Sequence, residues 1–71
     1  MSVSFTKIGN NCFIGPHAVI GRGVTVGDRC LVGANCFLSY SIPKNTIVMG
    51  NPAKKTGEVT EVNGQIKIIK L

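Results

Sequence analysis

The residues of this 71-residue chain that could do chemistry are one histidine, three cysteines and a set of lysines. His17 is the only histidine, and no two of Cys12, Cys30 and Cys36 lie close in sequence, so we expect no metal site. The odd number of cysteines, together with the lack of a visible secretory segment, favours free thiols.

The charge of the chain is strongly basic. Eight basic and three acidic residues give a net charge of +5. This balance favours an anionic partner such as a phosphate-bearing cofactor or a nucleic acid, although a solvated lysine-rich surface explains it equally well. The chain has no tryptophan and one tyrosine, which is little material for base stacking, so we expect no nucleic-acid partner. Without a signal peptide or an apolar stretch of ~20 residues, the expected location is cytoplasmic, with no membrane partner.

A six-residue repeat determines where these residues stand. An aliphatic side chain followed by a small residue recurs at Ile8-Gly9, Ile14-Gly15, Ile20-Gly21, Val26-Gly27, Val32-Gly33 and Leu38-Ser39. Four residues after each aliphatic comes a second apolar or small residue: Cys12, Ala18, Val24, Cys30, Cys36 and Ile42. A strict six-residue period is typical of a solenoid of stacked short strands.

Three hexapeptides form one triangular coil in solenoids of this period, so residues eighteen apart should lie above one another. The predicted stacks are Ile8 with Val26, Ile14 with Val32, Ile20 with Leu38, Cys12 with Cys30, Ala18 with Cys36 and Val24 with Ile42. All of these side chains are apolar or small, as a packed interior requires, so the three cysteines are expected inside. The turn positions Asn11, His17, Gly23, Arg29 and Asn35 are expected in the left-handed region of backbone conformation.

The residue before each aliphatic should point outwards. This predicts one outer face with Phe13 and Leu31, a second with Val19 and Phe37, and a third with Lys7, Thr25 and Pro43. Large exposed apolar patches usually mark interfaces. We therefore expect a homotrimer in which the two apolar faces of each chain meet those of its neighbours. Cover by the C-terminal tail would account for one of the two faces instead.

The repeat decays after Leu38. We expect a last short strand at Ile47–Met49, a chain break at Gly50-Asn51-Pro52 and a linker over Lys54–Gly57. Asn63-Gly64 between extended runs predicts a β-hairpin, whose expected role is to cover the open end of the solenoid. The expected organisation is one domain, with the repeat over residues 1–50 and an exit loop and hairpin tail over residues 51–71.

The run from Ile8 to Lys54 resembles the bacterial hexapeptide-repeat acyltransferases, and Ile42–Lys54 looks like the end of the coil in the maltose, galactoside, xenobiotic and sugar-amine acetyltransferases. The resemblance implies an all-β fold, a left-handed parallel β-helix of about two and a half coils with a C-terminal hairpin cap. It also implies a trimer that binds acetyl-CoA in a groove between two subunits.

Carried over residue by residue, the resemblance places the pantetheine arm of acetyl-CoA along Gly33, Ala34 and Ser39. The nucleotide end would lie beside Gly50, Asn51, Pro52 and Ala53, and Lys54 and Lys55 would meet phosphates as flexible point charges. Members of the family use a histidine as general base. The only candidate here is His17, which falls in an ordinary turn position and does not match the family's catalytic position.

Two functions stay open at this point. The first is an acetyl-CoA-dependent O- or N-acetyltransferase, of minimal size or truncated, with an acceptor that the chain does not identify. The second is a non-catalytic trimeric β-helix scaffold derived from such an enzyme, with or without binding of CoA.

Overall fold

The computed structural model describes residues 6–70, and this part of the chain is all-β, with no helix that could cross a membrane. Its strands are β1 (Lys7–Ile8), β2 (Phe13–Ile14), β3 (Val19–Ile20), β4 (Thr25–Val26), β5 (Leu31–Val32), β6 (Phe37–Leu38), β7 (Thr46–Met49), β8 (Lys54–Val62) and β9 (Gln65–Lys70). The first six have two residues each, because the chain turns a corner within every hexapeptide.

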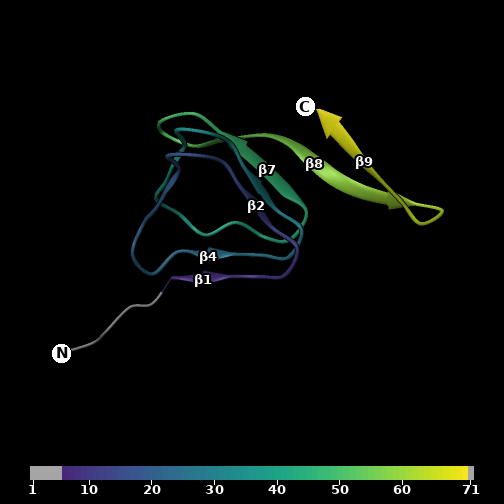
Figure 1. Cartoon of the computed structure of the whole chain (residues 1–71), viewed down its shortest axis with the longest axis horizontal. Helices are drawn as coiled ribbons and strands as arrows, with labels where there is room; N and C mark the ends of the chain where they lie inside the picture. Colours follow the sequence, from purple (N-terminus) through teal and green to yellow (C-terminus); the bar gives the residue numbers. More distant parts are fainter. Residues whose placement is uncertain (1–5, 71) are drawn as a thin grey trace.

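The short strands stack as parallel pairs on the three sides of a triangle (Figure 1). β1 pairs with β4, β2 with β5 and β3 with β6. In each pair the partners are eighteen residues apart, as in Ile8 with Val26 and Ile14 with Val32. The stacking of residues that the six-residue repeat predicts is therefore confirmed for the first two coils.

The core lies inside the triangle and deepens towards the C-terminal end. Val24, Val26, Cys30, Val32, Cys36 and Leu38 are each at most 3% exposed. Their equivalents in the first coil are less covered, with Ile8 at 49% and Ile14 at 36%, because no described part of the chain lies beneath them. The second coil is thus the best-packed layer of the molecule.

The glycine after each aliphatic allows close contact between coils. A Cβ atom on Gly15 would lie 2.5 Å from the backbone nitrogen of Ala34, and one on Gly27 would lie 2.3 Å from that of Lys44. Asn11, His17, Gly23, Arg29 and Asn35 all have positive φ, which confirms the predicted left-handed turns. Asn45 has a positive φ as well. Gly15 and Gly27 are therefore positions with no room for a side chain, and the turn positions are ones that need a left-handed backbone.

The second coil is two residues shorter than predicted. Ile42 forms a parallel bridge with Val26 and does not stack on Val24, so the step there is sixteen residues. The reason is that only three residues connect Leu38 to Ile42, whereas five connect Ile20 to Val26. The predicted stack of Val24 with Ile42 is wrong, although Ile42 is buried as expected.

The same shortening moves Pro43 away from its predicted outer position. Ser41 takes the place above Thr25, whose backbone N–H donates to the Ser41 hydroxyl at 2.9 Å. Pro43 lies above Gly27, whose missing Cβ would be 2.6 Å from the Pro43 carbonyl carbon. The next strand keeps the new step, since Leu31 pairs with Ile47.

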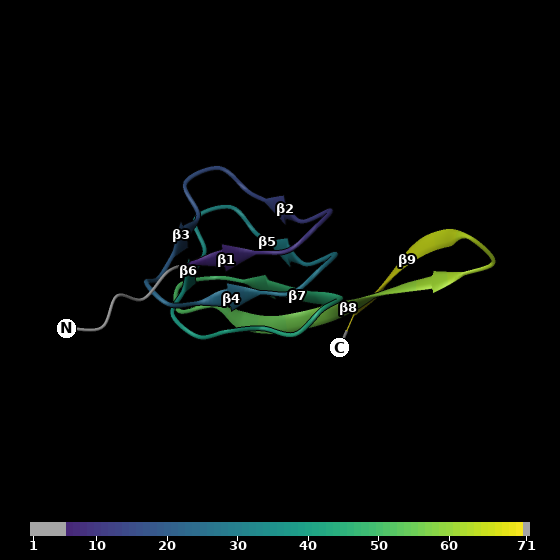
Figure 2. The ribbon, with the colours of Figure 1, turned by 90° about the horizontal axis from the view of Figure 1, so that it is seen from below.

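The tail forms a hairpin that begins earlier than predicted. Lys54–Gly57 is not a linker but the first part of β8, which pairs antiparallel with β7 because that strand would otherwise have a free edge. Asn63 and Gly64 both have positive φ, as the two-residue turn between β8 and β9 requires. Beyond Val59 the hairpin projects away from the coils (Figure 2), and the molecule measures 47 × 21 × 19 Å.

Candidate functional site

The predicted site residues other than Lys54 and Lys55 fall on the corners of the triangle. The first corner, between β1 and β2 and their equivalents, comprises residues 9–12, 27–30 and 43–45. The second corner, between β2 and β3, comprises residues 15–18, 33–36 and 50–53. The third corner, between β3 and β4, comprises residues 21–24 and 39–41.

Polar groups of the first corner are already paired with one another. Asp28 accepts a hydrogen bond from the backbone N–H of Asn10 at 2.7 Å. The Arg29 side chain donates to the amide oxygen of Asn45 at 2.9 Å. Binding a ligand here would break contacts that hold successive coils together, so the first corner is a poor candidate site.

The second corner brings together most of the predicted site residues. The backbone N–H of Asn35 donates to the carbonyl of Pro16 at 3.0 Å, which places His17 one coil below Ala34 and Asn35. Gly33 is buried and Ala34 is exposed, so the backbone beside Ala34 is open to a ligand. His17 is exposed with φ 60, and its imidazole makes no hydrogen bond to any other residue between 6 and 70.

The exit turn, residues 50–53, runs along the free edge of β6. The N–H of Phe37 donates to the carbonyl of Gly50 at 3.1 Å, and the N–H of Ala53 donates to the carbonyl of Phe37 at 2.9 Å. Gly50, Asn51 and Pro52 are exposed, whereas Ala53 is buried. The exit turn is therefore fixed to the coil and at the same time presents open backbone.

Tyr40 holds the exit turn from the third corner, a role that sequence reasoning missed. Its hydroxyl donates to the carbonyl of Ala53 at 2.7 Å. The available signal was that the chain's only tyrosine stands in the turn that is two residues short. Its neighbour Ser39 lies at the third corner, with its Cα 3.5 Å from the position of a Cβ on Gly21. Ser39 is thus separated by β6 from Gly33 and Ala34.

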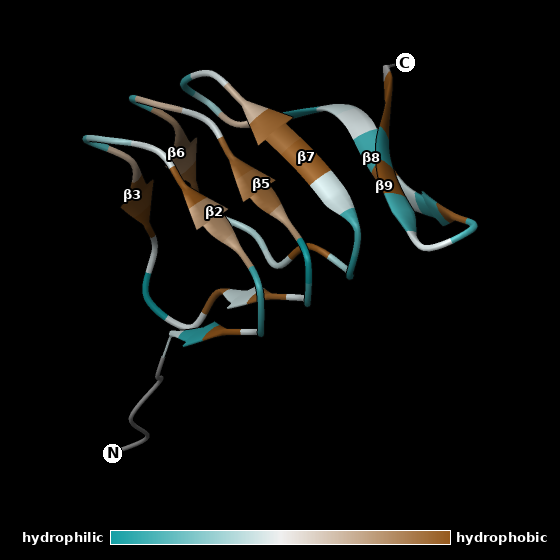
Figure 3. Cartoon of the chain, turned by 45° about the vertical axis from the view of Figure 1, so that its right-hand side comes forward, coloured by the Kyte–Doolittle hydropathy of each residue, from teal (hydrophilic) through white to brown (hydrophobic). Residues whose placement is uncertain are grey.

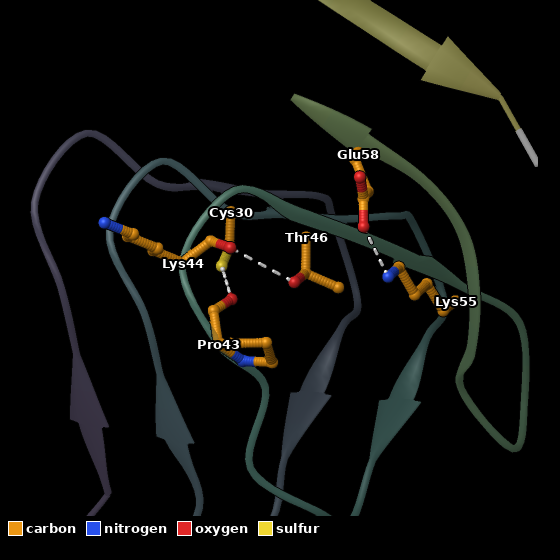
Figure 4. Close-up of polar contacts among 6 residues, drawn as sticks. All are labelled: Cys30, Pro43, Lys44, Thr46, Lys55 and Glu58. Atoms are coloured by element: carbon orange, nitrogen blue, oxygen red, sulfur yellow. Dashed lines mark hydrogen bonds and ion pairs between the residues drawn. The ribbon is translucent and has the colours of Figure 1, made fainter. Parts of the chain in front are cut away.

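The two lysines at the start of β8 differ in their contacts. Lys55 forms an ion pair with Glu58, with 2.7 Å between Nζ and Oε1 (Figure 4). Both side chains are about half exposed, so the pair is worth at most about 1 kcal/mol and a phosphate could displace it. Lys54 pairs with Met49 through its backbone, next to the second corner, and its side chain is exposed. Both amines are therefore accessible to an anion from solvent.

The three cysteines are free thiols that are wholly or partly buried. Cys30 and Cys36 are buried as predicted, and Cys12 in the first coil is partly covered. Cys30 donates to the carbonyl of Pro43 at 3.0 Å (Figure 4). Burial raises the pKa of the Cys30 and Cys36 thiols. At Cys30, hydrogen bonds with nearby backbone groups lower the pKa and offset part of this rise. Such thiols are poor nucleophiles at neutral pH. Within residues 6–70 no three side chains of His, Cys, Asp or Glu gather to hold a metal.

Comparison with known proteins gives a consistent result. The family model described as "Bacterial transferase hexapeptide (six repeats)" matches residues 5–39. Galactoside O-acetyltransferase from Escherichia coli (strain K12) is 41% identical over 54 residues, which are 76% of this chain and 27% of that protein. The chain thus spans about a quarter of that relative's length.

Solved structures agree with the observed stacking of strands. A galactoside acetyltransferase in complex with coenzyme A matches with a TM-score of 0.72 and 42% identity, over 75% of this chain and 26% of that one. A hexapeptide-repeat-containing acetyltransferase from Vibrio cholerae O1 biovar eltor, complexed with acetyl coenzyme A, matches with a TM-score of 0.76 and 34% identity. That match covers 79% of this chain and 31% of the other.

Proposed function

This chain belongs to the hexapeptide-repeat acetyltransferase family, and from that premise we propose that it forms the acetyl-CoA-binding part of an O- or N-acetyltransferase. In this proposal each chain contributes about two and a half coils of a left-handed β-helix. The first half of the hairpin closes the edge of β7, and acetyl-CoA lies in a groove between subunits of a homotrimer.

The observation that carries the proposal is the geometry of the exit turn. Gly50 and Ala53 form backbone hydrogen bonds with Phe37, and the Tyr40 hydroxyl donates a hydrogen bond to the carbonyl of Ala53. A rigid turn with exposed backbone can bind the nucleotide end of acetyl-CoA without losing conformational freedom, which favours binding. Lys54 and Lys55 follow directly and can attract the phosphates of the nucleotide.

The trimer is supported by the apolar side chains that point outwards. On the face formed by β3 and β6, Val19 is 51% and Phe37 is 41% exposed. On the face formed by β2, β5 and β7, Phe13 is 61% exposed and Leu31 is partly covered. Burying such side chains contributes roughly 25 cal/mol per Å² of apolar surface, so association is favoured. The faces adjoin the second corner, which would therefore point towards the threefold axis.

In the catalytic form of this proposal, His17 takes the proton from the acceptor. The acceptor oxygen or nitrogen attacks the thioester carbonyl, the carbon–sulfur bond breaks, and CoA leaves as the thiolate, which receives the proton. His17 has no partner within the described residues that would orient its ring, so a neighbouring subunit would have to supply one. The same observation favours the second candidate function, a trimeric scaffold that binds acetyl-CoA without turnover.

Calorimetric titration with acetyl-CoA tests the proposal. We expect saturable binding that weakens with added salt, and the Lys54→Ala/Lys55→Ala variant should bind about 5- to 30-fold more weakly. Lys67→Ala is the control, because it removes one charge from the far hairpin strand, and it should weaken binding much less than the double variant does. Lack of binding by the wild type would refute the proposal. If binding occurs, unchanged turnover in His17→Ala would remove His17 from the mechanism.

A further inference from the structure

A mainly apolar groove lies between the coils and the hairpin, apart from the proposed acetyl-CoA site. It has a volume of about 220 Å³ and is lined mainly by Phe13 and Leu31 of the coils and by Val59, Ile66 and Ile68 of the hairpin. Asn11, Arg29 and Cys30 complete the lining at the first corner. The strands on this side, β2, β5 and β7, consist mostly of hydrophobic residues (Figure 3). Phe13, Ile66 and Ile68 are 61%, 66% and 56% exposed, so the groove is open to solvent in the single chain.

The outer half of the hairpin is not supported by the rest of the chain. β8 pairs with β7 only from Lys54 to Glu58, and the N–H of Val59 makes one more bond, to the carbonyl of Asn45 at 2.9 Å. From Thr60 onwards the two strands pair only with each other. A two-stranded ribbon of this kind is at best marginally stable in water, so the projecting half needs a partner.

The partner that fits this groove is a second copy of the same chain. The face with Val19 and Phe37 is apolar and uncovered within the described residues, and it adjoins the groove face at the second corner. When three copies meet with their second corners inwards, the groove face of one copy lies opposite the Val19–Phe37 face of the next. The projecting hairpin, which extends past the first corner (Figure 1), then reaches the neighbour's third corner.

Charge is complementary at the place where the hairpin would arrive. Glu61 pairs with Ile66 across the hairpin. It stands two residues after Val59 on the same strand, so its side chain lies on the same face, the groove side. Arg22 is exposed at the third corner. Neither side chain forms an ion pair with another side chain of residues 6–69. A carboxylate on one copy would therefore meet an unpaired guanidinium on the next.

We propose that the hairpin is an arm that clasps the neighbouring copy, with Ile66 and Ile68 against its third corner and Glu61 paired with its Arg22. This inference rests on the proposed trimer, and it assigns to the tail a role in assembly. The arm would also close the outer side of the cleft between two subunits, where acetyl-CoA is proposed to bind.

Measurement of mass against protein concentration, by sedimentation equilibrium, tests the arm. We expect Ile66→Ser/Ile68→Ser to move the midpoint of trimer dissociation to at least about tenfold higher concentration. Val62→Ser/Ile69→Ser is the matched control, since these residues lie on the opposite side of the hairpin and it should assemble like the wild type. Equal behaviour of the two variants would overturn the arm while leaving the trimer in place.

Charge reversal tests where the arm binds. Glu61→Arg and Arg22→Glu should each weaken assembly, and the double variant should recover much of the loss. Absence of recovery would overturn binding at the third corner. A wild-type protein that stays monomeric would refute the trimer itself, and a dimer would show that the hairpins of two copies pair in another way and overturn the arm.

Discussion

Replacing Gly27 by alanine should destabilise the protein because of where the new methyl group would lie. Its Cβ would stand 2.3 Å from the nitrogen of Lys44 and 2.6 Å from the carbonyl carbon of Pro43. Both are backbone atoms of the next coil, so no side chain can swing aside. Ordinary contact of a Cβ begins at 3.4 Å, and the two coils would have to separate by roughly 1 Å, a fifth of the ~4.8 Å between strands.

The expected loss follows from two opposing terms. Overpacking of this kind costs typically 1–3 kcal/mol. Alanine restricts the unfolded chain more than glycine and returns about 0.4–1 kcal/mol, since Gly27 does not need a positive φ. The difference spans about 0–2.6 kcal/mol, and its middle, a loss of roughly 1.3 kcal/mol in the free energy of unfolding, is the net prediction.

Gly21→Ala is the matched control for this prediction. Gly21 follows an aliphatic residue in the same way, but its Cβ would meet its nearest atom, the carbonyl oxygen of Leu38, at 3.2 Å. Its stability should therefore stay within about 0.5 kcal/mol of the wild type. Urea unfolding followed by far-ultraviolet circular dichroism, at one fixed protein concentration, gives both values. A Gly27→Ala variant as stable as Gly21→Ala would refute the close-contact explanation of the repeat.

Three further outcomes can be measured on the same protein. Tyr40→Phe removes the hydrogen bond to Ala53 and should lower the free energy of unfolding by about 0.5–1.5 kcal/mol in urea titration; no loss would show that the exit turn is held by its backbone bonds alone. A thiol reagent should modify Cys12 first, and Cys30 and Cys36 only on unfolding, as peptide mass analysis of timed samples can check; equal rates would contradict the packing. Because the folded state raises the pKa of Cys30 and Cys36, stability should be full below the unfolded thiol pKa of about 8.5 and fall as the pH rises above it. Urea midpoints measured between pH 7 and about 9.5 test this, and a midpoint that rises with pH would contradict it.

The repeat predicted the fold in some detail because each position has one dominant physical demand. Residues such as Val32 and Leu38 must be apolar to fill the interior, and Asn35 must accept a left-handed backbone. The shortening of the second coil was not predictable from the pattern. Ile42 is apolar and suits either register, so hydrophobicity alone does not distinguish a partner at Val24 from one at Val26.

The candidate site was partly predictable for a related reason. His17 and Ala34 share a corner because turn positions repeat regularly along the coil. The bond from Tyr40 to Ala53 joins a side chain to a backbone carbonyl thirteen residues away, and no residue type marks such an acceptor. The early start of β8 was hidden for a similar reason, since Lys54 and Lys55 become strand through the free edge of β7 and not through their own preference.

The most direct test of the central claim is to titrate the nitrogen-15-labelled protein with acetyl-CoA and follow its backbone amide signals. The proposed function predicts saturable shifts at Ala34, Gly50, Asn51 and Ala53, around the second corner and the exit turn. No shifts at millimolar acetyl-CoA, or shifts confined to the first corner around Asn10 and Asp28, would contradict it.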